Sequence, residues 1–176
     1  SVTAEEDRPF AGLDFTTAAE AAGVSQAELL CGLVARSQGK VGVILMSMAQ
    51  ADVDRVLTLP WVPLISDALY GGGDMPHPRL YGAFPKFLRE YVRERSLLTF
   101  GQAVRKMTSL PAKRLGLKDR GALLPGYYAD VLLFDPTKFT DRATFQSPKQ
   151  LASGLARVFV NGTDPRHHSG KLIKRN

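Results

Sequence analysis

Asp67 and the loop that follows it are the first candidates for chemistry in this sequence. Asp67 follows the apolar run Trp61–Ile65, with Ser66 between them, and begins a segment rich in glycine and proline. In α/β proteins, loops that leave the carboxyl ends of strands carry most active sites. A carboxylate at such a position can act as a general base or bind a metal ion. The residues alone favour the commoner role of an aspartate after a strand, which is an Asx turn or a helix cap.

The glycine run 71–73 within this loop resembles a phosphate-binding loop only superficially. It lacks the Lys-Ser/Thr pair of a Walker loop and the spacing of a dinucleotide-binding fingerprint. We therefore interpret the glycines as the flexible part of a flap over the site. The single cysteine, Cys31, lies inside an apolar helical pattern and is expected to be a buried structural thiol.

The elements that must position Asp67 are predicted from the apolar runs before it. Val41–Met46 and Trp61–Ile65 are continuous apolar runs, which is typical of parallel strands buried on both faces. A short helix is predicted between them over Ala51–Leu57, with Val53 and Val56 facing inward. Strand, helix and strand together predict a βαβ unit.

The remaining pattern is mainly helical. The pairs Thr17/Glu20 and Ser25/Glu28 have the spacing of capping boxes, and the second helix is expected to run to about Gln38 before Gly39 ends it. An apolar stripe in that helix contains Leu29, Leu30, Leu33 and Val34. Further helices are predicted over Phe84–Glu94, over Phe100–Met107 with Thr99 as N-cap, and from Pro111 to near Gly116. The last two strands are predicted over Val131–Phe134 and Arg157–Val160.

Charge and hydropathy bound the class of protein. The 176 residues carry a formal net charge of +6, and Arg89, Arg93 and Arg95 alternate with Glu90 and Glu94 as on a solvated helix face. We interpret the charge as solubility with some preference for anionic ligands. Because no aromatic-basic motif is present, nucleic acid is not expected as a partner. Because no run approaches ~18 apolar residues and no signal sequence is evident, we expect no membrane partner and a cytoplasmic location.

Three segments, in order, resemble the N-acyl-D-amino-acid deacylase (D-aminoacylase) branch of the amidohydrolases. Residues 41–67 are similar to the last two barrel strands of that family with their intervening helix. Residues 75–117 contain His77-Pro78-Arg79, which is similar to the family's HPR motif. Residues 119–136 (DRGALLPGYYADVLLFDP) are similar to its G-x-x-x-PG-x-x-ADV signature. The resemblance covers nearly all of the chain from about Gly12.

The resemblance implies an α/β fold that is the C-terminal part of a TIM-type (β/α)8 barrel. Residues 1–118 would supply about the last two strands and their helices. Residues 119–176 would supply the C-terminal strands of a small β-domain. A whole barrel needs ~250 residues, so barrel strands one to six would be missing from this chain. We therefore expect a missing N-terminal barrel segment or a homo-oligomer as partner.

The resemblance also implies roles for site residues. Asp67 falls on the family's strand-eight aspartate, which takes a proton from a zinc-bound water and passes it to the departing amine. Arg79 falls on the HPR arginine and would bind the carboxylate of a small-molecule N-acyl amino acid, and His77 would support substrate binding. A loop arginine bonded to carbonyls and a structural histidine are the respective alternatives. Ala68 departs from the glycine common at that position, which puts substrate preference in doubt.

Metal binding is expected to need residues outside this sequence. Catalytic zinc requires about three protein ligands, and the histidines here are His77, His167 and His168, none in an HxH motif. We expect Zn²⁺ in the complete enzyme and none bound by this chain alone, with Asp67 as its single candidate ligand. The leading hypothesis is a fragment of a zinc-dependent hydrolase of N-acyl-D-amino acids. An inactive remnant that serves as a structural or interaction module, and a cyclic-amide hydrolase of the dihydroorotase or hydantoinase type, remain alternatives.

Overall fold

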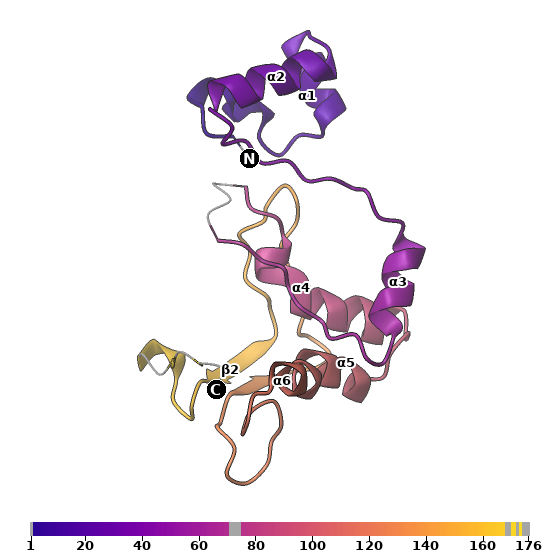
Figure 1. The fold of residues 1–176 in the computed structure, drawn as a ribbon, viewed down its shortest axis with the longest axis vertical. Coiled ribbons are helices and arrows are strands. Elements are labelled where there is room, and N and C mark those ends of the chain that lie inside the picture. Colours follow the sequence, from indigo (N-terminus) through magenta and orange to yellow (C-terminus); the bar gives the residue numbers. More distant parts are fainter. Residues whose placement is uncertain (1, 71–74, 168–169, 172, 174–176) are drawn as a thin grey trace. The chain divides into compact units, whose positions relative to one another are not determined.

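The computed structural model describes residues 2–70, 75–167, 170–171 and 173 (Figure 1). The predicted flap at Gly71–Gly73 lies outside the described residues. The chain divides into two compact units. The first unit comprises the segments up to Ser47, Asp67–Tyr81 and Ala143–Gln150, and the second comprises Met48–Ser66, Gly82–Arg142 and the chain from Leu151 onward. The domain division at residue 118 remains a prediction.

Two capped helices form most of the first unit. Helix α1 (Phe15–Ala22) begins after Asp14, whose side chain accepts the backbone N–H of Thr17, so the predicted start at Thr17 is wrong. The better cap lies three residues earlier, because Asp14 Oδ1 is 3.0 Å from that nitrogen. Helix α2 (Gln26–Arg36) begins with the predicted capping box of Ser25 and Glu28. It is preceded by the 3-10 helix η1 (Glu5–Phe10) and by α1.

The core of the first unit is small. Ala18 and Ala19 of α1 and Leu29 and Leu33 of α2 are buried and pack together. Leu30 and Val34, which belong to the predicted stripe, are each 42% exposed. Cys31 is also exposed, so the expectation of a buried thiol is wrong. The buried face of α2 is therefore narrow and consists of Leu29 and Leu33.

Helices and a two-stranded sheet make up the second unit. Helix α3 (Gln50–Thr58) confirms the helix predicted between the apolar runs. Helix α4 (Arg79–Phe87) crosses from the first unit and continues as the π-helical segment η2 (Leu88–Glu94). Helices α5 (Phe100–Met107) and α6 (Ser109–Leu115) follow, and a short 3-10 helix η3 spans Pro165–His167. Thr99 and Gln102 form a capping box at α5, and Gly116 ends α6 at φ 69°.

The core of the second unit lies between η2, α5 and the sheet. Its buried members are Phe87, Leu88, Tyr91, Leu98, Ala103 and Phe139. Strands β1 (Val131–Phe134) and β2 (Leu155–Phe159) pair antiparallel, with Val131 opposite Phe159. Both predicted strands are therefore confirmed, the second with its start two residues earlier. Among the described residues, no helix is long and apolar enough to cross a membrane.

The prediction of two buried parallel strands before Asp67 is wrong. Neither Val41–Met46 nor Trp61–Ile65 forms a strand in the structure. Several of their side chains are largely exposed, among them Leu45 at 77% and Ile65 at 69%. A strand needs neighbours that accept and donate its ladder hydrogen bonds, and the described residues form no ladder along these runs. The α/β class stands, with two strands in place of a parallel sheet.

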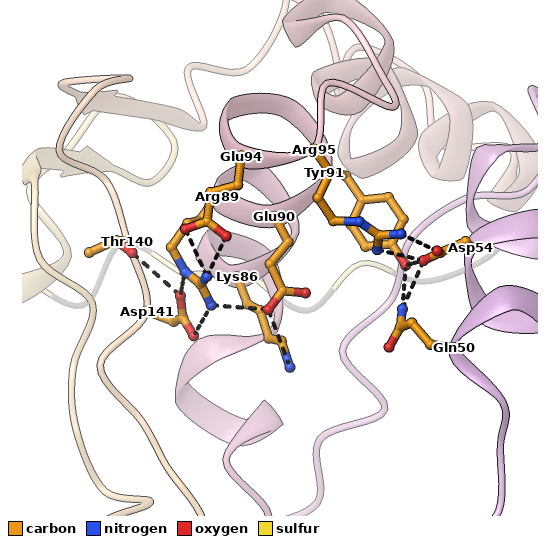
Figure 2. A network of polar contacts seen from close by, with 10 residues as sticks. All are labelled: Gln50, Asp54, Lys86, Arg89, Glu90, Tyr91, Glu94, Arg95, Thr140 and Asp141. Carbon is orange, nitrogen blue, oxygen red and sulfur yellow. Dashed lines mark hydrogen bonds and ion pairs between the residues drawn. The ribbon is translucent and has the colours of Figure 1, made fainter.

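The charged face predicted on Phe84–Glu94 is not simply solvated (Figure 2). Arg89 Nε donates to Asp141 Oδ1 at 2.8 Å, and Arg89 Nη1 donates to Glu94. The bond to Asp141 raises the pKa of Arg89 above its ordinary value. Arg93 Nη1 donates to the carbonyl of Phe139 at 2.7 Å. These arginines therefore tie η2 to the segment around Asp141.

A second polar cluster joins α3 to η2 (Figure 2). The carboxylate of Asp54 accepts hydrogen bonds from Arg95, from the hydroxyl of Tyr91 at 2.6 Å and from Gln50 at 2.8 Å. The bonds from Arg95, Tyr91 and Gln50, in that order of importance, hold the pKa of Asp54 well below its usual value. Burial, and then the bond to Asp54, raises the pKa of Tyr91 to about 12.

Candidate active site

Asp67 occupies a backbone conformation that few aspartates adopt. Its φ is +48°, in the left-handed region, and its side chain is 67% exposed. Residues other than glycine cost roughly 1–3 kcal/mol in sparsely populated regions, and aspartate is among those that tolerate the left-handed one best. Asp67 therefore holds a less favourable backbone conformation and presents its carboxylate to solvent.

His77 and Arg79 are fixed by the start of helix α4. The backbone N–H of Arg79 donates to Nδ1 of His77 at 3.0 Å, and the N–H of Leu80 donates to the His77 carbonyl at 3.0 Å. His77 thus satisfies N–H groups that the first turn of a helix leaves without partners. Its ring also meets Phe145 edge to face, with centroids 5.4 Å apart. This arrangement favours the structural interpretation of His77.

The structure brings Asp67 and Arg79 together. Nη1 of Arg79 lies 2.9 Å from Oδ2 of Asp67, and the Arg79 side chain is 38% exposed. The guanidinium has five N–H donors, so one salt bridge leaves it the capacity to bind a second carboxylate. The pair therefore places a carboxylate that can accept a proton beside a guanidinium cation, and both groups are accessible to solvent.

The described residues do not fit a zinc site of their own. Among them, no group of three or more histidine, cysteine, aspartate or glutamate side chains comes close enough to hold a metal ion. Structural and catalytic zinc sites use about three or four such ligands. Asp67 is held by Arg79, and Nδ1 of His77 is held by a backbone N–H. Zinc ligands would have to come from outside the described part of the chain.

Sequence reasoning named all three of these residues but missed how they are arranged. Asp67 and Arg79 were assigned separate roles, as proton carrier and as carboxylate binder, with no contact expected between them. The salt bridge brings the residue with the left-handed φ, Asp67, to the first residue of helix α4, Arg79. The His-Pro pair before Arg79 was the available signal, since proline is common where a helix begins.

Known proteins with related sequences match most of this chain. A sequence model of the amidohydrolase family matches residues 16–163. An N-acyl-D-aspartate deacylase of Alcaligenes xylosoxydans xylosoxydans is 46% identical over 121 residues, which are 69% of this chain and 24% of that protein. An N-acyl-D-glutamate deacylase of the same organism is 40% identical over 148 residues, or 81% of this chain and 30% of that protein.

Solved structures show the same relationship. The N-acyl-D-glutamate deacylase of Bordetella bronchiseptica, in complex with zinc and a phosphonate inhibitor that mimics the tetrahedral intermediate, superposes with a TM-score of 0.77 at 37% identity. The matched region covers 89% of this chain and 32% of that one. A D-aminoacylase structure gives a TM-score of 0.80 at 36% identity, over 92% of this chain and 34% of that one.

The region of similarity therefore spans about a quarter to a third of each relative, and from 69% to 92% of this chain. It includes Asp67, Arg79 and the ADV signature at Ala129–Val131. On this match, the chain belongs to the amidohydrolase family.

Proposed function

We propose that this chain is the C-terminal portion of a zinc-dependent amidohydrolase that hydrolyses N-acyl-D-amino acids to a carboxylate and a free D-amino acid. The observation that carries the proposal is the 2.9 Å pair of Asp67 and Arg79. The similarity to deacylases of N-acyl-D-aspartate and N-acyl-D-glutamate supports the substrate class. The chain would contribute the C-terminal part of a (β/α)8 barrel.

The spacing of the pair suits this substrate. In an N-acyl amino acid, one carbon separates the free carboxylate from the amide nitrogen, so the carboxyl carbon and that nitrogen are about 2.5 Å apart. A carboxylate bound to Arg79 therefore brings the scissile amide close to the carboxylate that pairs with the same guanidinium. Charge-assisted, bidentate binding to arginine would also fix the orientation of the substrate.

Asp67 then has a place in the reaction. Amide hydrolysis requires a proton to leave the attacking water and a proton to reach the departing amine. A carboxylate beside the amide can accept the first proton and donate it in the second step. The exposed position of the Asp67 side chain leaves its carboxylate accessible to both groups. Arg79 would hold the substrate while this transfer takes place.

Zinc would be held by residues outside the described part of the chain, because the described residues supply no ligand group. When bound, zinc polarises the amide carbonyl and lowers the pKa of its water to about 7. The inactive-remnant hypothesis rests on the same lack of ligands. The two proposals differ in what they expect once the rest of the barrel is supplied.

A chimeric enzyme tests the proposal. This chain would replace the matched segment of the Alcaligenes N-acyl-D-glutamate deacylase, and the control would be the same deacylase with that segment deleted. Zinc content, mass in solution and hydrolysis of N-acetyl-D-aspartate, N-acetyl-D-glutamate and N-acetyl-D-leucine would be measured on both. We expect the chimera to bind zinc and to hydrolyse at least one D-substrate in preference to its L-enantiomer.

Two results would contradict the proposal. A chimera that is monodisperse and binds zinc, yet hydrolyses none of these substrates, would favour the remnant hypothesis. Hydrolysis of dihydroorotate or a hydantoin in place of the linear substrates would favour a cyclic-amide hydrolase.

A further inference from the structure

A cleft of about 550 Å³ lies within the second unit. It is formed where the turn after α3 meets the ends of α5 and α6, and its lining residues are Pro60, Trp61, Arg105, Leu110, Lys113 and Arg114. None of these residues belongs to the site at Asp67. Leu110 forms a buried floor at 7% exposure, and the other lining side chains reach the surface or its edge.

The cleft is strongly cationic. Arg105, Lys113 and Arg114 are all exposed, and no described residue that lines the cleft carries a carboxylate. Arg105 Nη1 donates to the carbonyl of Pro60 at 2.8 Å, and Arg114 Nη2 lies 3.5 Å from the carbonyl of Trp61. The first contact holds the Arg105 guanidinium beside Pro60, and the second places the Arg114 guanidinium near Trp61. Each one uses a single donor of the five that a guanidinium offers.

Trp61 adds an aromatic surface to these charges. Trp61 is 57% exposed, although tryptophan usually buries most of its large apolar area. An exposed tryptophan can stack on a planar ring, and arginine and lysine beside it can bind a phosphate attached to that ring. An alternative role for Arg105, Lys113 and Arg114 is to stabilise the helix dipoles, since these residues lie in the last turns of α5 and α6. That role explains the charges but not the exposed ring among them.

We propose that this cleft binds a small phosphate-bearing ligand with a planar ring, of the nucleotide class. Lys113 and the two arginines would hold the phosphate, and Trp61 would stack on the ring. The proposal is independent of the hydrolytic function, because it involves neither Asp67 nor Arg79.

Trp61 is itself the reporter for the experiment, because it is the sole tryptophan of the chain. The full chain would be titrated with AMP while tryptophan fluorescence is recorded at low ionic strength. Adenosine and inorganic phosphate would be titrated separately, to distinguish stacking alone from anion binding alone. We expect saturable quenching by AMP, much weaker quenching by adenosine, and competition by phosphate at higher concentration.

Three variants make the test specific. Lys113→Gln removes one exposed charge and should weaken AMP binding about 3- to 10-fold, as expected for one charge-assisted contact near solvent. Lys40→Gln removes an exposed charge from the first unit and should leave binding unchanged. Trp61→Phe, followed by calorimetry, should weaken binding without abolishing the phosphate contribution.

The outcomes that overturn the proposal are equally definite. Absence of saturable quenching by AMP would exclude the site. Equal effects of Lys113→Gln and Lys40→Gln would show that the quenching follows net charge and not this cleft. Binding of phosphate with the same affinity as AMP would remove the role given to Trp61.

Discussion

Arg79 Nη1 lies 2.9 Å from Asp67 Oδ2, although a loop of varied composition separates the two residues along the chain. The contact joins the carboxylate of a residue with a left-handed φ to a guanidinium at the start of helix α4. Because the two side chains are in direct contact, substitution of either one should change the environment of the other. Separate kinetic signatures nevertheless follow from their different tasks.

Asp67→Asn should abolish proton transfer and leave binding largely intact. In the chimeric enzyme we expect kcat to fall by about 10²- to 10⁴-fold with a small change in KM, because general acid-base catalysis contributes that factor. Asparagine tolerates the left-handed conformation, so the backbone at position 67 should be preserved. Asp119→Asn is the matched control, since Asp119 also has a positive φ, of 58°. Equal losses in both variants would show that the effect is not specific to the carboxylate of Asp67.

Arg79→Lys should act mainly on substrate binding. Lysine keeps the charge but loses the planar fork that binds a carboxylate through two parallel hydrogen bonds. We expect KM to rise about 10- to 100-fold with a smaller change in kcat, as for loss of a charge-assisted hydrogen bond. Steady-state kinetics with an N-acyl-D-amino acid and its carboxamide would check this result. The carboxamide should bind equally weakly to the unmodified enzyme and to Arg79→Lys. The control is Arg8→Lys, which replaces an exposed arginine and should change neither kcat nor KM.

Local determinants explain which elements could be predicted from the sequence. Ser25 with Glu28 and Thr99 with Gln102 form their caps within four residues, so the starts of α2 and α5 follow from the sequence alone. β1 was predicted with its observed bounds because its apolar run is short and flanked by turn residues. α1 shows the limit of this reasoning, since Asp14 competes with Thr17 for the cap and wins.

Distant partners explain what could not be predicted. Val41–Met46 has the composition of a buried strand, but a strand forms only where another segment supplies its ladder. Arg89 and Asp141 are 52 residues apart, and no periodicity signals their pairing. The contact of Asp67 with Arg79 is likewise not signalled by any periodicity. The residue types of the site were therefore predictable, and their contacts were not.

Asp54 should make the protein less stable in acid. Arg95, Tyr91 and Gln50 lower the pKa of Asp54 in the folded state. The stability that they contribute is present above the unfolded pKa of about 4 and is lost as the pH falls toward the folded value. Asp54→Asn should reduce this loss between about pH 4 and pH 2 and lower stability at neutral pH. Urea unfolding at several pH values would test this, with Asp52→Asn on the exposed side of α3 as control. Parallel pH profiles for Asp54→Asn and the unmodified protein would refute it.

Lys106 should contribute to stability through two carbonyl groups. Lys106 is 2% exposed, and its Nζ donates to the carbonyls of Leu59 and Val62, the latter at 2.8 Å. Burial, followed by the nearby charge of Arg105, lowers the pKa of the ammonium group. Lys106→Met keeps a long side chain but leaves both carbonyls without this donor, which should lower the free energy of unfolding by about 1–3 kcal/mol.

Denaturant unfolding at neutral pH would measure the effect of Lys106→Met. The matched control is Lys113→Met, which removes an exposed ammonium group from the next helix and should change stability by less than about 0.5 kcal/mol. Because burial already disfavours the charged form of Lys106, the unmodified protein should gain stability as the pH rises toward the unfolded lysine pKa of about 10.4. Lys106→Met should lose that part of the pH dependence. A variant as stable as the unmodified protein would mean that the cost of burying the charge offsets both hydrogen bonds.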